Sequence, residues 1–205
     1  MHRGSSGDDP LTVLEGAVSI TQRLADGLDP ADLALPTPCA EYDVGRVLEH
    51  LIGWQLVFAA CVAGEEPPFA GGSPTYALTD DPGRDLRVAS VTLVGSLKRC
   101  AADTVTLPYR GETPVTHLID EMVAETVIHT WDLAAGLGQS IEYDAATVAA
   151  AHTGLTKLLG ESFAAQGFRA PTGGTATGST TTGGTTTNEL DRLLVRSGRS
   201  PGDWR

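Results

Sequence analysis

The spacing of apolar residues predicts a chain made almost entirely of helices. In five long segments they recur every three or four positions, which is the repeat of a helix with a buried face. The predicted helices span residues 12–28, 44–62, 83–102, 114–137 and 145–166, followed by a short sixth over 189–196. Val105–Tyr109 predicts one short extended piece ending at a turn, and essentially no sheet is expected. The pattern predicts an all-α four-helix bundle with one or two peripheral C-terminal helices.

Residues that commonly cap the two ends of helices support these boundaries. Asp43, Asp144 and Asn188 precede three of the helices, where their side chains can accept hydrogen bonds from unpaired backbone amides. Gly64 and Gly138 follow the second and the fourth of these helices, where the left-handed backbone conformation that glycine permits often ends a helix.

Two stretches interrupt the helical pattern and suggest how the chain is divided. Residues 65–82 are rich in Gly and Pro and predict a long loop, of the kind that often shapes a pocket. Residues 171–187 contain no large apolar side chain and predict a flexible Thr/Gly-rich loop. We therefore expect a four-helix-bundle domain over residues 10–170, that loop, and a C-terminal helix and tail over 188–205 that docks on the bundle.

The composition argues against several classes of function. The net charge is −12, the pI is about 4.7, and Lys98 and Lys157 are the only lysines. Such a chain lacks a basic surface for phosphates, so we expect neither a nucleic-acid partner nor a membrane partner. The apolar run 51–64 is too short to cross a bilayer, and the N-terminus lacks the apolar segment of a signal peptide. Three widely spaced cysteines without a Cys-x-x-Cys pair fit a reducing cytoplasm.

A carboxylate and two histidines within apolar helices are the strongest candidates for chemistry. Glu125 and His129 lie four residues apart in the predicted helix 114–137, so both project from one face, one turn apart. His50 lies in a second apolar helix. Because buried charge is costly unless paired or metal-bound, these donors predict a divalent metal site, with open positions typical of a catalytic metal. Zinc, nickel, manganese and iron are the candidate ions.

Two more acidic residues share that helical face. Asp132 is predicted either to accept a hydrogen bond that fixes an imidazole tautomer, or to act as a catalytic acid or base near bound water. Glu121 lies one turn before Glu125 and is compatible with a surface residue. Two readings without a metal stay open: a solvent-exposed face of ionisable groups, and buried histidines satisfied by hydrogen bonds.

Three motifs, taken together, resemble a known superfamily. They are Leu35-Pro-Thr-Pro-Cys39, Asp43-Val-Gly-Arg-Val-Leu-Glu-His50 and Glu125-Thr-Val-Ile-His129-Thr-Trp-Asp132. In this order they resemble the actinobacterial branch of the DinB-like superfamily, which is similar to the N-terminal metal-binding domain of mycothiol-dependent maleylpyruvate isomerase. The segment 189–199 also resembles the end of small proteins in that branch.

The resemblance implies a DinB-like four-helix bundle that holds one divalent ion, often zinc. It implies His50, Glu125 and His129 as the metal ligands. It also implies a thiol-dependent, mycothiol-type S-transferase or isomerase that acts on an electrophilic metabolite. Because the chain leaves no room for the separate C-terminal domain of the isomerase, we do not expect maleylpyruvate isomerase activity itself.

Several alternatives remain open for the activity and the partners. A metal-dependent lyase, hydrolase or cyclase without a thiol would use the same ligands, and so would a non-catalytic metal- or ligand-binding bundle. The expected partners are a small-molecule substrate and a low-molecular-weight thiol. Apolar surface on the helices 12–28 and 83–102 would permit a homodimer.

Overall fold

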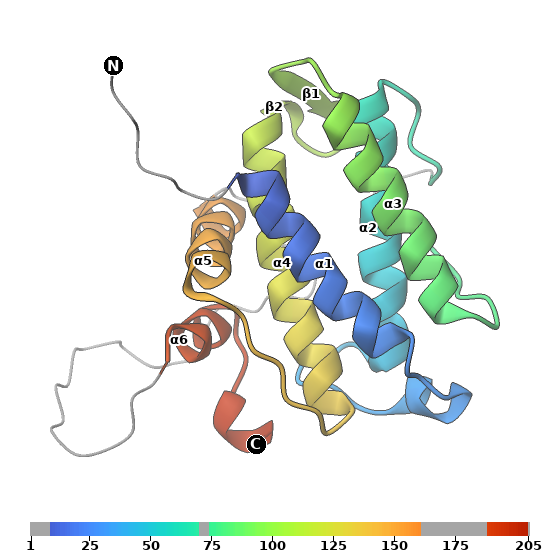
Figure 1. The fold of residues 1–205 in the computed structure, drawn as a ribbon, viewed down its shortest axis with the longest axis vertical. Helices are drawn as coiled ribbons and strands as arrows, with labels where there is room; N and C mark the ends of the chain where they lie inside the picture. Colours follow the sequence, from blue (N-terminus) through green and yellow to red (C-terminus); the bar gives the residue numbers. More distant parts are fainter. Residues whose placement is uncertain (1–8, 70–73, 161–187, 205) are drawn as a thin grey trace, which may run out of the picture.

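The chain forms a bundle of helices (Figure 1). A computed structural model describes residues 9–69, 74–160 and 188–204. Its α-helices are α1 (Pro10–Ala25), α2 (Val44–Ala63), α3 (Pro82–Arg99), α4 (Val115–Gly136), α5 (Ala145–Gly160) and α6 (Glu189–Arg196). Short 3-10 helices span Pro30–Ala34 and Pro201–Trp204. The predicted all-α bundle is confirmed, while the predicted loop 171–187 and the end of the fifth predicted helix lie outside the described residues.

A small hairpin between α3 and α4 departs from the prediction of essentially no sheet. β1 (Thr104–Leu107) and β2 (Gly111–Pro114) pair antiparallel. The second strand was missed because four residues that begin with Gly and end with Pro carry little strand signal. Gly111 has a φ of 85°, the left-handed conformation that this turn requires. The hairpin leads directly into α4. Its turn carries Tyr109, whose ring contacts Trp54 of α2, and Arg110, which contacts Glu121 of α4.

α4 is the central helix of the bundle. α1, α2 and α5 all pack against it, and Figure 1 shows α1 crossing it with α5 and α2 on either side. Most of its surface is therefore covered, and its polar residues lie inside the protein. Those that are buried are Glu121, Thr126, His129, Thr130 and Asp132.

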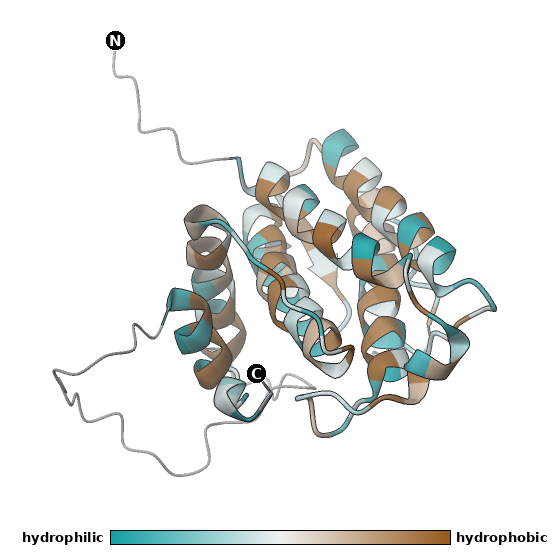
Figure 2. Cartoon of the chain, turned by 60° about the horizontal axis from the view of Figure 1, so that its bottom comes forward, coloured by the Kyte–Doolittle hydropathy of each residue, from teal (hydrophilic) through white to brown (hydrophobic). Residues whose placement is uncertain are grey.

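α2 owes its apolar character to its place in this bundle. Of the described helices, it alone is long and apolar enough to cross a membrane by length and composition. However, 56% of its most apolar stretch is buried inside the bundle. Figure 2 shows apolar residues along most of its length, in contrast to the mixed colouring of α3. Even its buried Gln55 has a partner inside the protein, because Oε1 accepts a hydrogen bond of 2.9 Å from Ser90. These contacts are those of a core helix.

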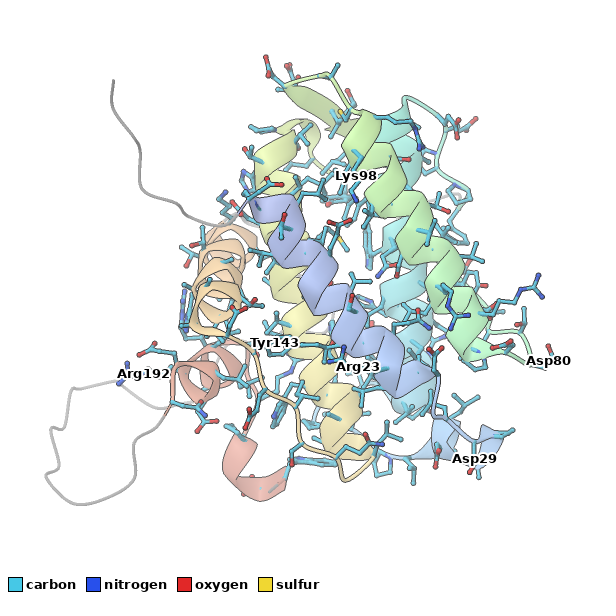
Figure 3. The ribbon with its side chains drawn as sticks, viewed as in Figure 1. Arg23, Asp29, Asp80, Lys98, Tyr143 and Arg192 are labelled. Carbon is cyan, nitrogen blue, oxygen red and sulfur yellow. The ribbon has the colours of Figure 1, made fainter. Side chains whose placement is uncertain are left out.

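α6 packs on the bundle through one face only. Leu193 and Leu194 are fully buried in the larger apolar cluster of the core. Arg192 lies on the opposite face and points away from the bundle (Figure 3). Asn188 caps this helix, since its side chain accepts a hydrogen bond of 2.8 Å from the backbone amide of Asp191.

The start of α2, which carries His50, depends on one cap. Oδ1 of Asp43 accepts a hydrogen bond of 2.8 Å from the amide of Arg46, as the sequence predicted. Asp43→Ala is expected to lower the free energy of unfolding by about 1 kcal/mol in urea denaturation. Asp80→Ala is the control, because that exposed residue points into solvent before α3 (Figure 3) and should change stability by less than about 0.5 kcal/mol. Equal losses in both variants would contradict the capping role.

Candidate metal centre

His50, Glu125 and His129 converge between α2 and α4. Nε2 of His50 and Nε2 of His129 each lie 3.3 Å from Oε2 of Glu125. One donor atom from each residue lies within 4.8 Å of the other two. α4 supplies Glu125 and His129 from successive turns, and α2 supplies His50 across the helix interface. The structure thus brings the three predicted ligands together, and the binding of a metal stays a prediction.

The spacing of these donor atoms suits a shared metal ion. A hydrogen bond between charged nitrogen and oxygen is typically about 2.7–2.9 Å long. Two donors that each lie about 2.1 Å from one ion in tetrahedral geometry are roughly 3.4 Å apart. The two nitrogen–oxygen distances to Glu125, both 3.3 Å, are close to the separation expected for two ligands of one ion. Two imidazole nitrogens and one carboxylate oxygen suit zinc and other divalent transition metals, and three ligands leave coordination positions open.

The charges of the three groups favour a cation. Burial alone would keep Glu125 neutral, but hydrogen bonds with His129 and His50 lower its pKa to about 2. Burial lowers the pKa of His50, so this imidazole is neutral and offers a lone pair. Burial opposes the charging of His129 as well, but hydrogen bonds to Asp132 and Glu125 outweigh it and raise the pKa of His129. A cation that binds here would therefore compete with a proton on His129.

Aromatic rings flank the site beside His50, and Glu125 is the most exposed of the three ligands. Glu125 has 14% of its side chain exposed, against 7% for His50 and none for His129. The ring centroid of His50 lies 5.4 Å from that of Tyr42 and 6.4 Å from that of Trp54. Trp54 in turn contacts the rings of Phe58 and Tyr109. An apolar wall therefore adjoins the metal ligands.

Glu121, one turn before Glu125, belongs to a separate charged cluster. Its carboxylate lies 2.7 Å from Nη1 of Arg110 and 3.0 Å from Nε2 of His117. Only 1% of the residue is exposed, so Glu121 does not occupy the surface position that the sequence had left open for it. Burial is possible because the hairpin brings Arg110 onto the first turns of α4, where it balances the negative charge.

Asp132 supports His129 from the side opposite to Glu125. Its Oδ2 lies 2.9 Å from Nδ1 of His129, and neither residue is exposed. Burial disfavours the charged carboxylate, but Arg199 and the hydrogen bond with His129 lower the pKa of Asp132. An ionised carboxylate only accepts hydrogen bonds, so Nδ1 donates and Nε2 is left to face Glu125. These contacts favour the tautomer-fixing role of Asp132 over the catalytic acid or base.

Sequence reasoning missed Arg199. Its Nε donates to Oδ1 of Asp132 at 3.1 Å, and its Nη2 donates to Oδ2 at 2.6 Å. The two residues are 67 positions apart, and no spacing rule connects them. Two local signals were present: Arg199 directly follows Gly198, and it is the last residue of the segment 189–199 that resembles the end of small proteins in the superfamily branch.

Cys39 belongs to a second group of potential ligands, with His129 and Asp132. The donor atoms of this group also lie within 4.8 Å of one another. Burial and the nearby Asp132 raise the pKa of Cys39 to about 11, so the thiol is neutral near pH 7. Asp132 is already bound by Arg199. This group therefore suits a cation less well than the first.

Comparison with known proteins agrees with the resemblance seen in the motifs. A family model for the mycothiol maleylpyruvate isomerase N-terminal domain matches residues 14–134. The chain belongs to this family. The part of this chain that matches the mycothiol maleylpyruvate isomerase N-terminal domain includes all three candidate ligands and Asp132. Arg199 lies beyond it.

The similar proteins found include two of unknown activity. They are uncharacterized proteins of the Oshkosh and H37Rv strains of Mycobacterium tuberculosis. Each is 27% identical over 137 residues, which cover 66% of this chain and 71% of the relative. No solved structure matches the chain.

Proposed function

We propose that this protein is a divalent-metal-dependent enzyme that adds a low-molecular-weight, mycothiol-type thiol to an electrophilic metabolite. The thiol would stay in the product of an S-transferase, whereas an isomerase would release it again at the end of the reaction. The observation that carries the proposal is the convergence of His50, Glu125 and His129 at distances suited to one ion. Membership of a mycothiol-related family supports the choice of thiol. A reducing cytoplasm is the compartment that suits this chemistry and the three cysteines, none of which forms a disulfide.

The residues around the site have distinct roles in this proposal. A divalent ion held by the three ligands would lower the pKa of a bound thiol and keep a thiolate at neutral pH. Asp132 keeps the proton of His129 on Nδ1. Tyr42 and Trp54 restrict water beside His50 and offer an apolar surface to the carbon skeleton of the electrophile.

Turnover is expected to require both the metal and the thiol. Zinc-loaded protein should conjugate mycothiol to a chromogenic electrophile such as chlorodinitrobenzene, at a rate that falls to background after chelation. His50→Ala should lower the rate by at least about 100-fold, because the loss of a residue that merely supports a ligand costs 10- to 100-fold. His152→Ala is the control, since it removes an imidazole on α5 that contacts Arg196 and Glu189 instead. The absorbance of the conjugate measures the rate.

Other outcomes would point to the alternatives. Metal-dependent turnover of a substrate without any thiol would replace the proposal with a lyase, hydrolase or cyclase. Metal binding without turnover of any thiol and electrophile pair would favour a non-catalytic binding bundle.

A further inference from the structure

The end of α6 directs Arg199 into the bundle. The backbone amide of Gly198 donates to the carbonyl oxygen of Val195 at 3.0 Å. The backbone amide of Arg199 donates to the carbonyl oxygen of Leu194 at 2.9 Å. These two bonds, with a φ of 85° at Gly198, form a Schellman motif, which reverses the chain after a helix. Because the helix is held by buried leucines, the reversal places Arg199 inside the protein, with 5% exposed.

The guanidinium of Arg199 has fixed partners on both sides. Its Nη1 donates to the carbonyl of Ser197 at 2.8 Å, which anchors the side chain to its own turn. Nε and Nη2 donate to the two carboxylate oxygens of Asp132 at 3.1 Å and 2.6 Å. Two parallel bonds define the plane of a carboxylate as well as its position. Asp132 cannot rotate without breaking both.

The orientation of Asp132 in turn decides that of His129. The oxygen held by Nη2 of Arg199 at 2.6 Å is the one that lies 2.9 Å from Nδ1 of His129, whereas Nη2 itself lies farther from Nδ1, at 3.5 Å. A ring whose Nδ1–H is held in this direction presents Nε2 to Glu125, 3.3 Å away. Because His129 and Asp132 are fully buried, solvent has no direct access to take over the role of Arg199.

We propose that Arg199 is a positioning residue for the metal centre, which acts through Asp132 to hold His129 with Nε2 presented to the ion. Its purpose rests on the proposed function, whereas the arrangement of Arg199, Asp132 and His129 exists without a metal. The C-terminal turn, beyond the region that matches the family, is then part of the working site.

Two measurements on the full chain test this role. In metal-free protein, at a pH above the pKa of His129, ring nitrogen chemical shifts report which nitrogen carries the proton. The wild type should show Nδ1–H, and Arg199→Ala should show a mixture of tautomers. Competition with a chromogenic chelator should show zinc affinity weakened by about 10- to 100-fold in the variant. Arg199→Lys keeps the positive charge but cannot make two parallel hydrogen bonds to Asp132, so it should give intermediate values in both measurements. If Arg199→Ala does not fold, both measurements are made on Arg199→Lys instead.

Arg196→Ala is the matched control. Arg196 lies on the same helix and donates to Nδ1 of His152 at 3.1 Å and Oγ1 of Thr156 at 2.9 Å. Its loss loosens α6 on α5 but leaves the contact with Asp132, so tautomer and zinc affinity should stay at wild-type values. Equal losses in the Arg196 and Arg199 variants, or an unchanged Arg199→Ala protein, would overturn the proposal. A wild type that binds no zinc would refute the proposed function, while the tautomer measurement would still decide the role of Arg199.

Discussion

Replacing His129 with alanine is expected to remove the metal ion from this protein. His129 is a fully buried donor whose Nε2 lies beside Glu125, so no solvent-exposed group can substitute for it. The affinity for zinc should fall by at least about 100-fold, the upper end of the loss seen for supporting residues. Elemental mass spectrometry of untagged protein should show near-stoichiometric metal in the wild type and background levels in His129→Ala. A chelator should lower the melting temperature of the wild type alone, because a ligand that binds only the folded state stabilises it.

Two further variants separate loss of the site from loss of the fold. Glu125→Gln preserves the shape of the side chain and removes its charge, so it should also lose the metal. His152→Ala removes an imidazole outside the site and should retain it. Wild-type metal content in His129→Ala would rule out this centre. Absence of metal from the wild type, even after divalent ions are added, would favour buried histidines satisfied by hydrogen bonds.

The helices were predictable because their signals are local. A cap such as Asp43 bonds to an amide three residues away, and the apolar repeat of α4 extends over its whole length. Glu125 and His129 could be paired for the same reason, since four residues make about one helical turn. His50 required a further step, because only the packing of α2 on α4 brings it to the other two.

What sequence reasoning missed depends on contacts between distant segments. Glu121 was compatible with a surface residue because its partner Arg110, which is half-buried, belongs to a hairpin whose second strand has little signal of its own. Arg199 could not be linked to Asp132, because their contact depends on how α6 docks and how the chain turns after it. Ion pairs between distant segments produce no repeating pattern in the sequence from which they could be predicted.

The three carboxylates on the polar face of α4 differ in the positive charges beside them. Glu121 is balanced by Arg110, and Asp132 is balanced by Arg199. Among the described contacts, Glu125 meets the imidazoles of His50 and His129, which carry no permanent charge. A buried carboxylate without a permanent counter-charge is costly. A divalent ion would supply that counter-charge at Glu125, which differs from Glu121 and Asp132 in having no arginine among its described contacts.

Gly154→Ala is expected to disrupt the packing of α5 against the helix that carries the site. A Cβ atom at this position would lie 1.9 Å from the carbonyl oxygen of Asp120 and 3.0 Å from the Cβ of Ala124. The backbone of α4 cannot rotate aside as the end of a side chain can, so one of the helices must shift. We expect the free energy of unfolding to fall by about 3 kcal/mol or more, at or above the usual range for overpacking. Urea denaturation measures this loss.

Gly16→Ala is the matched control for that prediction, and it should have the opposite sign. Gly16 lies on the exposed face of α1, where an added Cβ meets nothing within 4 Å. Alanine there should stabilise the protein by about 0.5–1 kcal/mol, because it restricts the unfolded chain and favours the helix. A Gly154→Ala protein as stable as Gly16→Ala would show that α4 and α5 do not pack this closely. A destabilised Gly154→Ala protein should also hold less metal, because the displaced segment of α4 lies one turn before Glu125.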